Sequence, residues 1–267
     1  MEFIIQKYGN SLGEGDIVKS LLDDRFNRSL HEYIIRTFNE LESMDIEKLQ
    51  GKIPLGNINF VREYLYIVTG KTIDRYSFME PLEVPDCLRD KQFLNREYGI
   101  FNWEDIPDYQ QTMYYKDASI AKNWLVRKYS SLQGFRSDIV TNGYKDYDKH
   151  KYVVSSPVDF IAEYRLFVYN DEVIGVRYYN GGKEGCLYTP GRKVVKKMIS
   201  RISKARANGA YLPYSYTLDI GVDRNDTTSI IEMHNFVSCG LYGFSDIDIL
   251  YMYKDGIRYE LDRVKYR

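Results

Sequence analysis

The chain has 267 residues, of which 44% are hydrophobic, enough to build one large domain or two modest ones. Its net charge of −1 gives no global attraction to nucleic acid or to a membrane surface. Three widely spaced cysteines without a CxxC pair argue against a disulfide framework, and three histidines argue against a zinc site. Without a signal peptide or an 18-residue apolar run, we expect a soluble cytoplasmic protein.

The first part of the chain is predicted to be rich in helices. Residues 3–5 form a short apolar strand, and residues 16–45 are predicted to be helical. The reason is that apolar residues recur there at spacings of three and four, namely Leu30, Tyr33, Ile34, Phe38 and Leu41. A second helix is predicted over residues 60–68, closed by a glycine. Residues 77–109 are predicted to connect the two parts of the chain, with one short helix at 88–96.

From residue 124 onward the pattern changes to strands with one helix. Alternating or continuous apolar runs predict strands at residues 124–127, 138–140, 161–168, 173–179, 216–222 and 229–233. A buried apolar stripe predicts a helix over residues 192–207. The order indicates a smaller helix-rich N-terminal part followed by a strand-dominated α+β part.

Two of these strands each carry one acidic residue among apolar neighbours, Asp219 and Glu232. Ionised carboxylates in such places are costly unless they are paired or bound to a metal. If Arg224 and Asn225 form the tip of a two-residue hairpin, the two acids share one face as diagonal neighbours, roughly 7 Å apart. With Asn235 just beyond, they can then hold a hard cation such as Mg²⁺.

Two alternatives remain open for this pair of acids. Both carboxylates can instead be paired with arginine or lysine at the edge of a core. A shift of the strand pairing by one residue would also send Glu232 to the opposite face of the sheet.

Arginines on the preceding strands are candidates for phosphate binding. On the strand 161–168, alternation places Glu163 and Arg165 on one face, as a structural ion pair or as a phosphate contact. Arg127 ends an apolar strand, and a turn with Arg136 follows, whose backbone N–H groups can cradle phosphates. A two-residue turn at residues 170–171 places Arg177 on the face opposite to Arg165. The basic face of the helix 192–206 is either solvated or a site for a polyanion.

Four segments resemble the ATP-grasp superfamily, in particular small arginine-rich ATP-grasp proteins of phages and bacteria. They are residues 54–60, 125–135, 160–168 and 218–243. The resemblance implies an α+β fold in which two subdomains grip ATP. It places this ATP-grasp domain at residues 81–267, after a small α/β pre-ATP-grasp domain at residues 1–80.

The resemblance also implies roles for the arginines and for the segment between two strands. Arg127 and Arg165 would hold ATP phosphates, and Glu163 would orient Arg165 or face the nucleotide. Residues 155–159 would form the hinge under adenine, with Asp159 as a ribose partner. Arg136 would supply the charge that such proteins often place at residue 133 as a lysine.

For the metal, the resemblance implies that Asp219 and Glu232 bind Mg²⁺. The asparagine that completes the family's site lies two residues after the glutamate, where this chain has His234. Three possibilities follow for the third ligand, which is Asn235 brought in by a bulge, His234 itself, or water.

The function implied by the resemblance is that of an ATP-dependent carboxylate–amine ligase, or a ligase that uses another nucleophile. It would form an acylphosphate from Mg-ATP, release ADP, and act on a small-molecule or peptide carboxylate with an amine acceptor in the cytoplasm. The alternative is a nucleotide-binding or interaction protein with the same fold and no ligase turnover. Binding of nucleic acid through the basic helix is a weaker third possibility.

Overall fold

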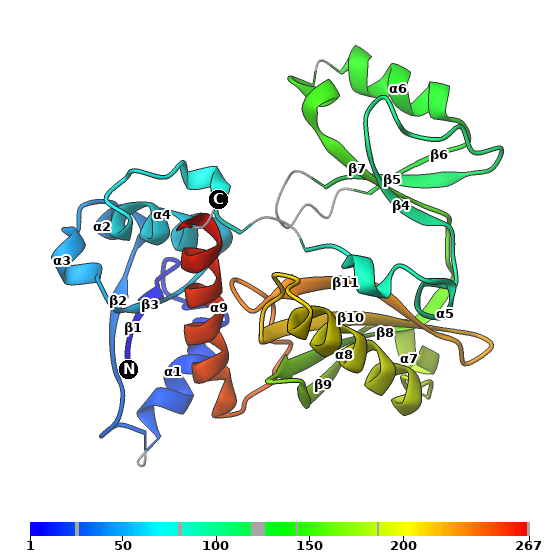
Figure 1. Ribbon diagram of the computed structural model, residues 1–267. Coiled ribbons are helices and arrows are strands. Elements are labelled where there is room, and N and C mark those ends of the chain that lie inside the picture. Colours follow the sequence, from blue (N-terminus) through cyan, green and yellow to red (C-terminus); the bar gives the residue numbers. More distant parts are fainter. Residues whose placement is uncertain (25–26, 80–81, 119–125, 143, 186, 266–267) are drawn as a thin grey trace.

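The protein is built from three β-sheets flanked by helices (Figure 1). The computed structural model describes residues 1–24, 27–79, 82–118, 126–142, 144–185 and 187–265. Within these residues there are one three-stranded sheet and two four-stranded sheets. No helix among them is long and apolar enough to cross a membrane.

The first sheet is parallel and belongs to the N-terminal part of the chain. Its order is β2-β1-β3, and its strands are β1 (Glu2–Gln6), β2 (Glu32–Arg36) and β3 (Ile53–Leu55). The accompanying helices are α1 (Gly15–Asp23), α2 (Phe38–Glu42), α3 (Ile46–Leu49) and α4 (Ile58–Val68). The predicted first strand and the predicted helix at residues 60–68 are thus confirmed.

The predicted continuous helix at residues 16–45 is wrong. The segment forms α1, then the strand β2, then α2, which begins in a capping box between Thr37 and Glu40. Ile34 and Ile35 pair with Ile4 and Ile5 of β1, and β-branched residues pack well on such a pleated surface. Because the spacing of apolar residues there also suits a helix, only pairing with β1 decides the outcome.

The second sheet is antiparallel, with the order β11-β10-β8-β9. Its strands are β8 (Phe160–Tyr169), β9 (Glu172–Asn180), β10 (Ser215–Asp223) and β11 (Thr228–Asn235). The helix α8 (Arg192–Ala207) buries its apolar stripe against one face of this sheet, after the short α7 (Gly182–Gly185). The four predicted strands and the predicted helix are confirmed.

The third sheet is also antiparallel and has the order β4-β7-β5-β6. Its strands are β4 (Tyr98–Asn102), β5 (Met113–Asp117), β6 (Arg127–Tyr129) and β7 (Lys151–Ser155). The helix α6 (Leu132–Thr141) covers the side away from the second sheet (Figure 1). Shorter helices nearby and in the connections are α5 (Lys91–Leu94), η1 (Arg75–Ser77), η2 (Asp86–Leu88) and η3 (Tyr147–Lys149).

Two predictions in this region are wrong, because the turn around Gly134 and the strand at 138–140 both belong to α6. Ser131 caps this helix by accepting a hydrogen bond from the Gly134 N–H, so the serine marks a helix start. Of the predicted strand 124–127, residues 124 and 125 lie outside the described residues.

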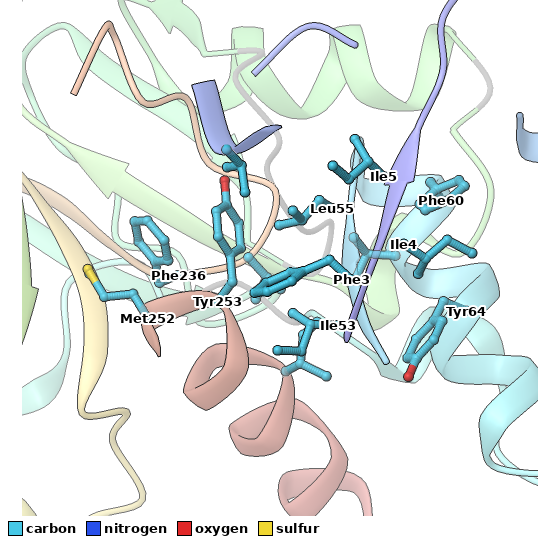
Figure 2. Packing of buried hydrophobic residues seen from close by; sticks show 14 of the residues in the cluster. Phe3, Ile4, Ile5, Ile53, Leu55, Phe60, Tyr64, Phe236, Met252 and Tyr253 are labelled. Carbon is cyan, nitrogen blue, oxygen red and sulfur yellow. The ribbon is translucent and has the colours of Figure 1, made fainter. Parts of the chain in front are cut away.

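The C-terminal helix α9 (Asp248–Lys265) lies between the first and second sheets (Figure 1). Figure 2 shows Met252 and Tyr253 of this helix in one apolar cluster with Phe3 and Ile53 of the first sheet and with Phe236. The sequence pattern divides the chain near residue 80, yet the last helix shares the core of the first part.

A glycine sets the closeness of this packing. A Cβ atom added to Gly256 of α9 would lie 2.5 Å from the backbone oxygen of Phe236. We expect Gly256→Ala to destabilise the fold by about 1–3 kcal/mol through overpacking, although alanine favours a helix. Urea unfolding measures the change. Gly134→Ala in α6 is the control, since its nearest contact is the Ser131 hydroxyl at 3.3 Å. An unchanged midpoint for Gly256→Ala would contradict this packing.

Candidate active site

Two carboxylates and one imidazole converge on one face of the second sheet. Ligand atoms of Asp219, Glu232 and His234 all lie within 4.8 Å of one another. Asp219 of β10 pairs directly with Glu232 of β11, and Thr217 pairs with His234. The prediction that the two acids share a face is therefore confirmed, with a shorter separation than the predicted diagonal.

Two shifts of one residue produce this register. The connection between β10 and β11 is one residue longer than predicted, because Val222 pairs with Thr228. That change alone would place Glu232 on the opposite face. A β-bulge between Asp219 and Ile220 adds a second shift and restores the alternation.

Arg165 of β8 holds the carboxylate of Asp219 in a buried, bidentate ion pair. Its Nε and Nη2 atoms lie 2.8 and 2.7 Å from the two carboxylate oxygens, and Nη1 donates to the Gly240 carbonyl at 3.1 Å. Burial alone would lower the pKa of Arg165, but Asp219 raises it above its usual range. The guanidinium is thus permanently charged and fixed in place.

Glu163 has a different environment from the one predicted. It accepts a hydrogen bond from the Asn180 amide at 2.9 Å, and it lines a cavity beside β8. Because Asp219 holds Arg165, no orienting role of Glu163 on that arginine is needed.

Lys116 of β5 connects the third sheet to Glu232 of the second. Its Nζ atom lies 2.8 Å from Glu232 Oε2 and 2.9 Å from Glu83 Oε1, while His234 Nε2 lies 2.9 Å from Glu232 Oε1. Burial would raise the pKa of Glu232, but His234 and Lys116 together lower it below its usual range. For Glu83, burial dominates over Lys116 and raises the pKa. Glu232 is therefore ionised at neutral pH.

A cavity of about 370 Å³ lies between the second and third sheets, and Lys116 and Glu232 are at its wall. Most of the other lining residues come from β4, β5, β7, β8 and the hinge between β7 and β8. They include Tyr98, Tyr114, Val153, Ser155, Ser156, Val158 and Phe160. Three residues of the predicted hinge thus border the cavity, whereas Asp159 is exposed and is not among its lining residues.

Arg127 does not reach this cavity, contrary to its predicted role. It pairs with Tyr115, whose side chain is buried in the core beneath α6, so both side chains leave the sheet on the side away from Lys116. There its guanidinium pairs with Asp138 and stacks 4.8 Å from the Tyr144 ring. The next residue, Lys128, pairs instead with a residue that lines the cavity, and its Nζ lies 5.9 Å from that Tyr114 ring.

Arg136 is also directed elsewhere. Its Nη2 atom donates to the Trp103 carbonyl at 2.9 Å, and the guanidinium lies 5.4 Å from that indole ring. The cause is that the segment after Arg127 forms a helix on the outer side of the sheet rather than a turn over the cavity. No sequence signal marked Lys116 or Lys128, because the predicted strands in this region did not include β5.

Asn235 lies on the other face of β11 from His234. Its side-chain amide donates a hydrogen bond to Glu260 of α9, in the buried interior. Of the three possibilities for the third position, the structure places His234 beside the carboxylates and does not bring Asn235 to them.

The donor set fits a hard divalent cation. Asp219 and Glu232 offer carboxylate oxygens, which Mg²⁺ prefers, and each oxygen keeps a lone pair beyond its present hydrogen bond. On the same face, Thr217 has a buried hydroxyl without a hydrogen-bond partner among the described residues. Such a hydroxyl can serve a metal-bound water, while His234 steadies Glu232.

Comparison with protein families gives one match that covers more than half of the chain. Residues 93–252 match a family described as an ATP-grasp domain, the second family of its clade. A search of curated proteins found no match.

Solved structures with a similar fold cover nearly the whole chain. The D-cycloserine synthetase DcsG is 9% identical over 99% of this chain and 100% of its own, with a TM-score of 0.56. The D-alanine–D-alanine ligase from Bacillus anthracis, complexed with ATP, is 12% identical over 99% and 97%, with a TM-score of 0.52. The ATP-grasp ligase PsnB, with a precursor variant, Mg and ADP, is 11% identical over 97% and 98%, with a TM-score of 0.50. The predicted ATP-grasp fold, α+β in class, is thereby confirmed.

Proposed function

Because this chain belongs to the ATP-grasp domain family that its sequence matches, we propose that it is an ATP-dependent ligase. It would join a carboxylate to an amine, or to another nucleophile, through an acylphosphate with release of ADP. The observation that carries this proposal is the pair of acids, Asp219 and Glu232, at a cavity whose wall includes the hinge segment.

ATP would occupy the cavity between the second and third sheets. Its base would lie among the hinge residues and the apolar walls formed by Val153 and Phe160, and its phosphates would extend toward Lys116. Apolar walls with a few polar groups are typical of pockets for cofactors and substrates. Lys128, on the cavity side of β6, would add a second positive charge for the phosphates.

Charge neutralisation is what phosphoryl transfer asks of a protein, and this site supplies it from fixed groups. Asp219 and Glu232 would hold Mg²⁺, which when bound supplies charge neutralisation at the phosphate oxygens. Lys116 would move from its two glutamates to a phosphate oxygen. Arg165, fixed by Asp219 and by the Gly240 carbonyl, would provide positive charge where the substrate carboxylate meets the terminal phosphate.

The direct test is carboxylate-dependent formation of ADP. The protein is incubated with Mg-ATP, hydroxylamine and a panel of amino acids, dicarboxylates and short peptides. An acylphosphate should be trapped as a hydroxamate in amounts equal to the ADP released. Stabilisation by Mg-ATP without any ADP would contradict the ligase and favour the nucleotide-binding protein without turnover. The direction of Arg127 away from the cavity favours that alternative.

We expect Lys116→Met to weaken binding of Mg-ATP by roughly 10- to 100-fold. The reason is that a charged hydrogen bond contributes about 1.5–3 kcal/mol, and each 1.4 kcal/mol is a factor of about ten. Calorimetric titration with a non-hydrolysable ATP analogue measures the change. Lys116→Arg should retain most of the affinity, and Lys193→Met on the exposed face of α8 should leave it unchanged. Equal affinities of Lys116→Met and wild type would exclude a phosphate contact.

A further inference from the structure

A second arginine, Arg177 of β9, lies directly opposite Arg165 on the same face of the second sheet. The predicted two-residue turn at Asn170 and Asp171 is present, and both residues have positive φ angles. A β-bulge between Phe167 and Val168 then shifts the pairing by one residue. The prediction that Arg177 faces away from Arg165 is therefore wrong, and the bulge is the reason.

The charges of these two arginines are balanced differently. Like charges directly opposite one another on a sheet are destabilising. Arg165 is neutralised by Asp219. Arg177, in contrast, donates only to the carbonyls of Val176 and Gly243, at 3.2 and 3.4 Å, and forms no ion pair within the described residues. Its positive charge is thus left for a ligand or for solvent.

The surroundings of Arg177 form a surface with aromatic walls. Its guanidinium lies 5.3 Å from the Phe244 ring. Tyr242, which is 45% exposed, stacks on Tyr179 at 5.0 Å and lies 5.0 Å from the guanidinium of Arg165. Planar rings of this kind hold an arginine in one orientation, so that its free N–H groups are ready for a planar anion.

The loop that carries these rings is held in a costly conformation. Ser238 and Tyr242 both have positive φ angles, of 50° and 48°, where a residue with a side chain is disfavoured. Such strain is concentrated at functional sites. The N-terminal part of the chain supports the loop, because the Leu241 N–H donates to Glu14 Oε1 at 3.1 Å.

We propose that Arg177, beside Tyr242, binds an anionic group of the substrate, a carboxylate or a phosphate, outside the nucleotide cavity. This inference rests on the proposed ligase function and names the class of substrate. Residues opposite one another on a sheet are about 5 Å apart, so a small molecule can span from Arg177 to the Arg165–Asp219 pair. The molecule that is phosphorylated, or its acceptor, therefore carries an anionic group besides the reacting one.

The test measures binding of simple anions while the nucleotide cavity is filled. Wild-type protein with saturating Mg²⁺ and a non-hydrolysable ATP analogue is titrated with inorganic phosphate and, separately, with succinate. At least one should bind, and Arg177→Gln should weaken it at least tenfold, with Arg177→Lys in between. Tighter binding of phosphate indicates a phosphorylated substrate, and tighter binding of succinate indicates a carboxylate.

Controls separate this inference from the proposed function. Arg224→Gln, at the exposed turn between β10 and β11, should bind both anions as wild type does. Affinity for the ATP analogue and the thermal midpoint should be unchanged in Arg177→Gln. If neither anion binds wild type, or if Arg177→Gln binds them equally well, the anion site is excluded. If the ATP analogue itself does not bind, the nucleotide proposal fails instead.

Discussion

Glu232→Gln is expected to reduce ADP formation by roughly 10²- to 10³-fold, the size typical of removing one electrostatic contact from a transition state. The substitution keeps the volume of the side chain but removes the charge that would hold Mg²⁺. It also removes the charge that pairs with Lys116 and His234. Steady-state release of ADP with the best carboxylate of the panel measures the loss, together with the Mg²⁺ concentration for half-maximal rate.

The design of this experiment must separate the metal site from the fold. Glu172→Gln, at an exposed position of β9, is the matched control and should turn over as wild type does. The Mg²⁺ requirement of Glu232→Gln should rise along with its loss of rate. If Glu232→Gln and wild type release ADP at the same rate, Glu232 holds no catalytic metal.

Asp219→Ala is expected to be the most destabilising of the substitutions proposed for this protein, by about 3–5 kcal/mol. It leaves the guanidinium of Arg165 buried without its carboxylate partner. At roughly 2–4 °C per kcal/mol for a chain of this size, the thermal midpoint should fall by about 10 °C. Urea unfolding of the variants measures the free energy directly.

A double replacement separates stability from function. Arg165→Met with Asp219→Leu removes both charges and should recover most of the lost stability, because apolar residues can replace a buried ion pair. Both Asp219→Ala and the double variant should remain inactive, since each lacks a group of the proposed site. Asp90→Ala is the control, because the exposed Arg201–Asp90 pair, at 3.7 Å, should contribute less than about 1 kcal/mol. A double variant as unstable as Asp219→Ala would contradict this account.

Local patterns were sufficient for much of the second sheet. The alternation along β8 and the continuous apolar runs of β10 and β11 predicted these strands, and the stripe of α8 predicted that helix. The cost of burying Asp219 and Glu232 marked them as unusual before any contact was known. The long C-terminal helix α9 was not predicted, although its apolar residues also recur at helical spacing.

Other features depended on pairing between distant segments. The periodicity at residues 30–41 suits a helix, and only the neighbouring β1 makes residues 32–36 a strand. A similar ambiguity hides the direction of Arg127, because the face of a short edge strand depends on which residue of β5 it opposes. Lys116 carries no local signal at all, since its two glutamate partners come from segments far away in the chain.

By itself, then, the sequence determined the strands and helices of the second sheet and the two acids that need a partner, because these depend on local periodicity and on the cost of buried charge. Tertiary structure alone decided which charges meet. The two bulges, one before Ile220 and one before Val168, set whether Glu232 joins Asp219 and whether Arg177 joins Arg165. A single inserted residue reverses the face of every side chain that follows it, and only pairing with a neighbouring strand reveals the insertion.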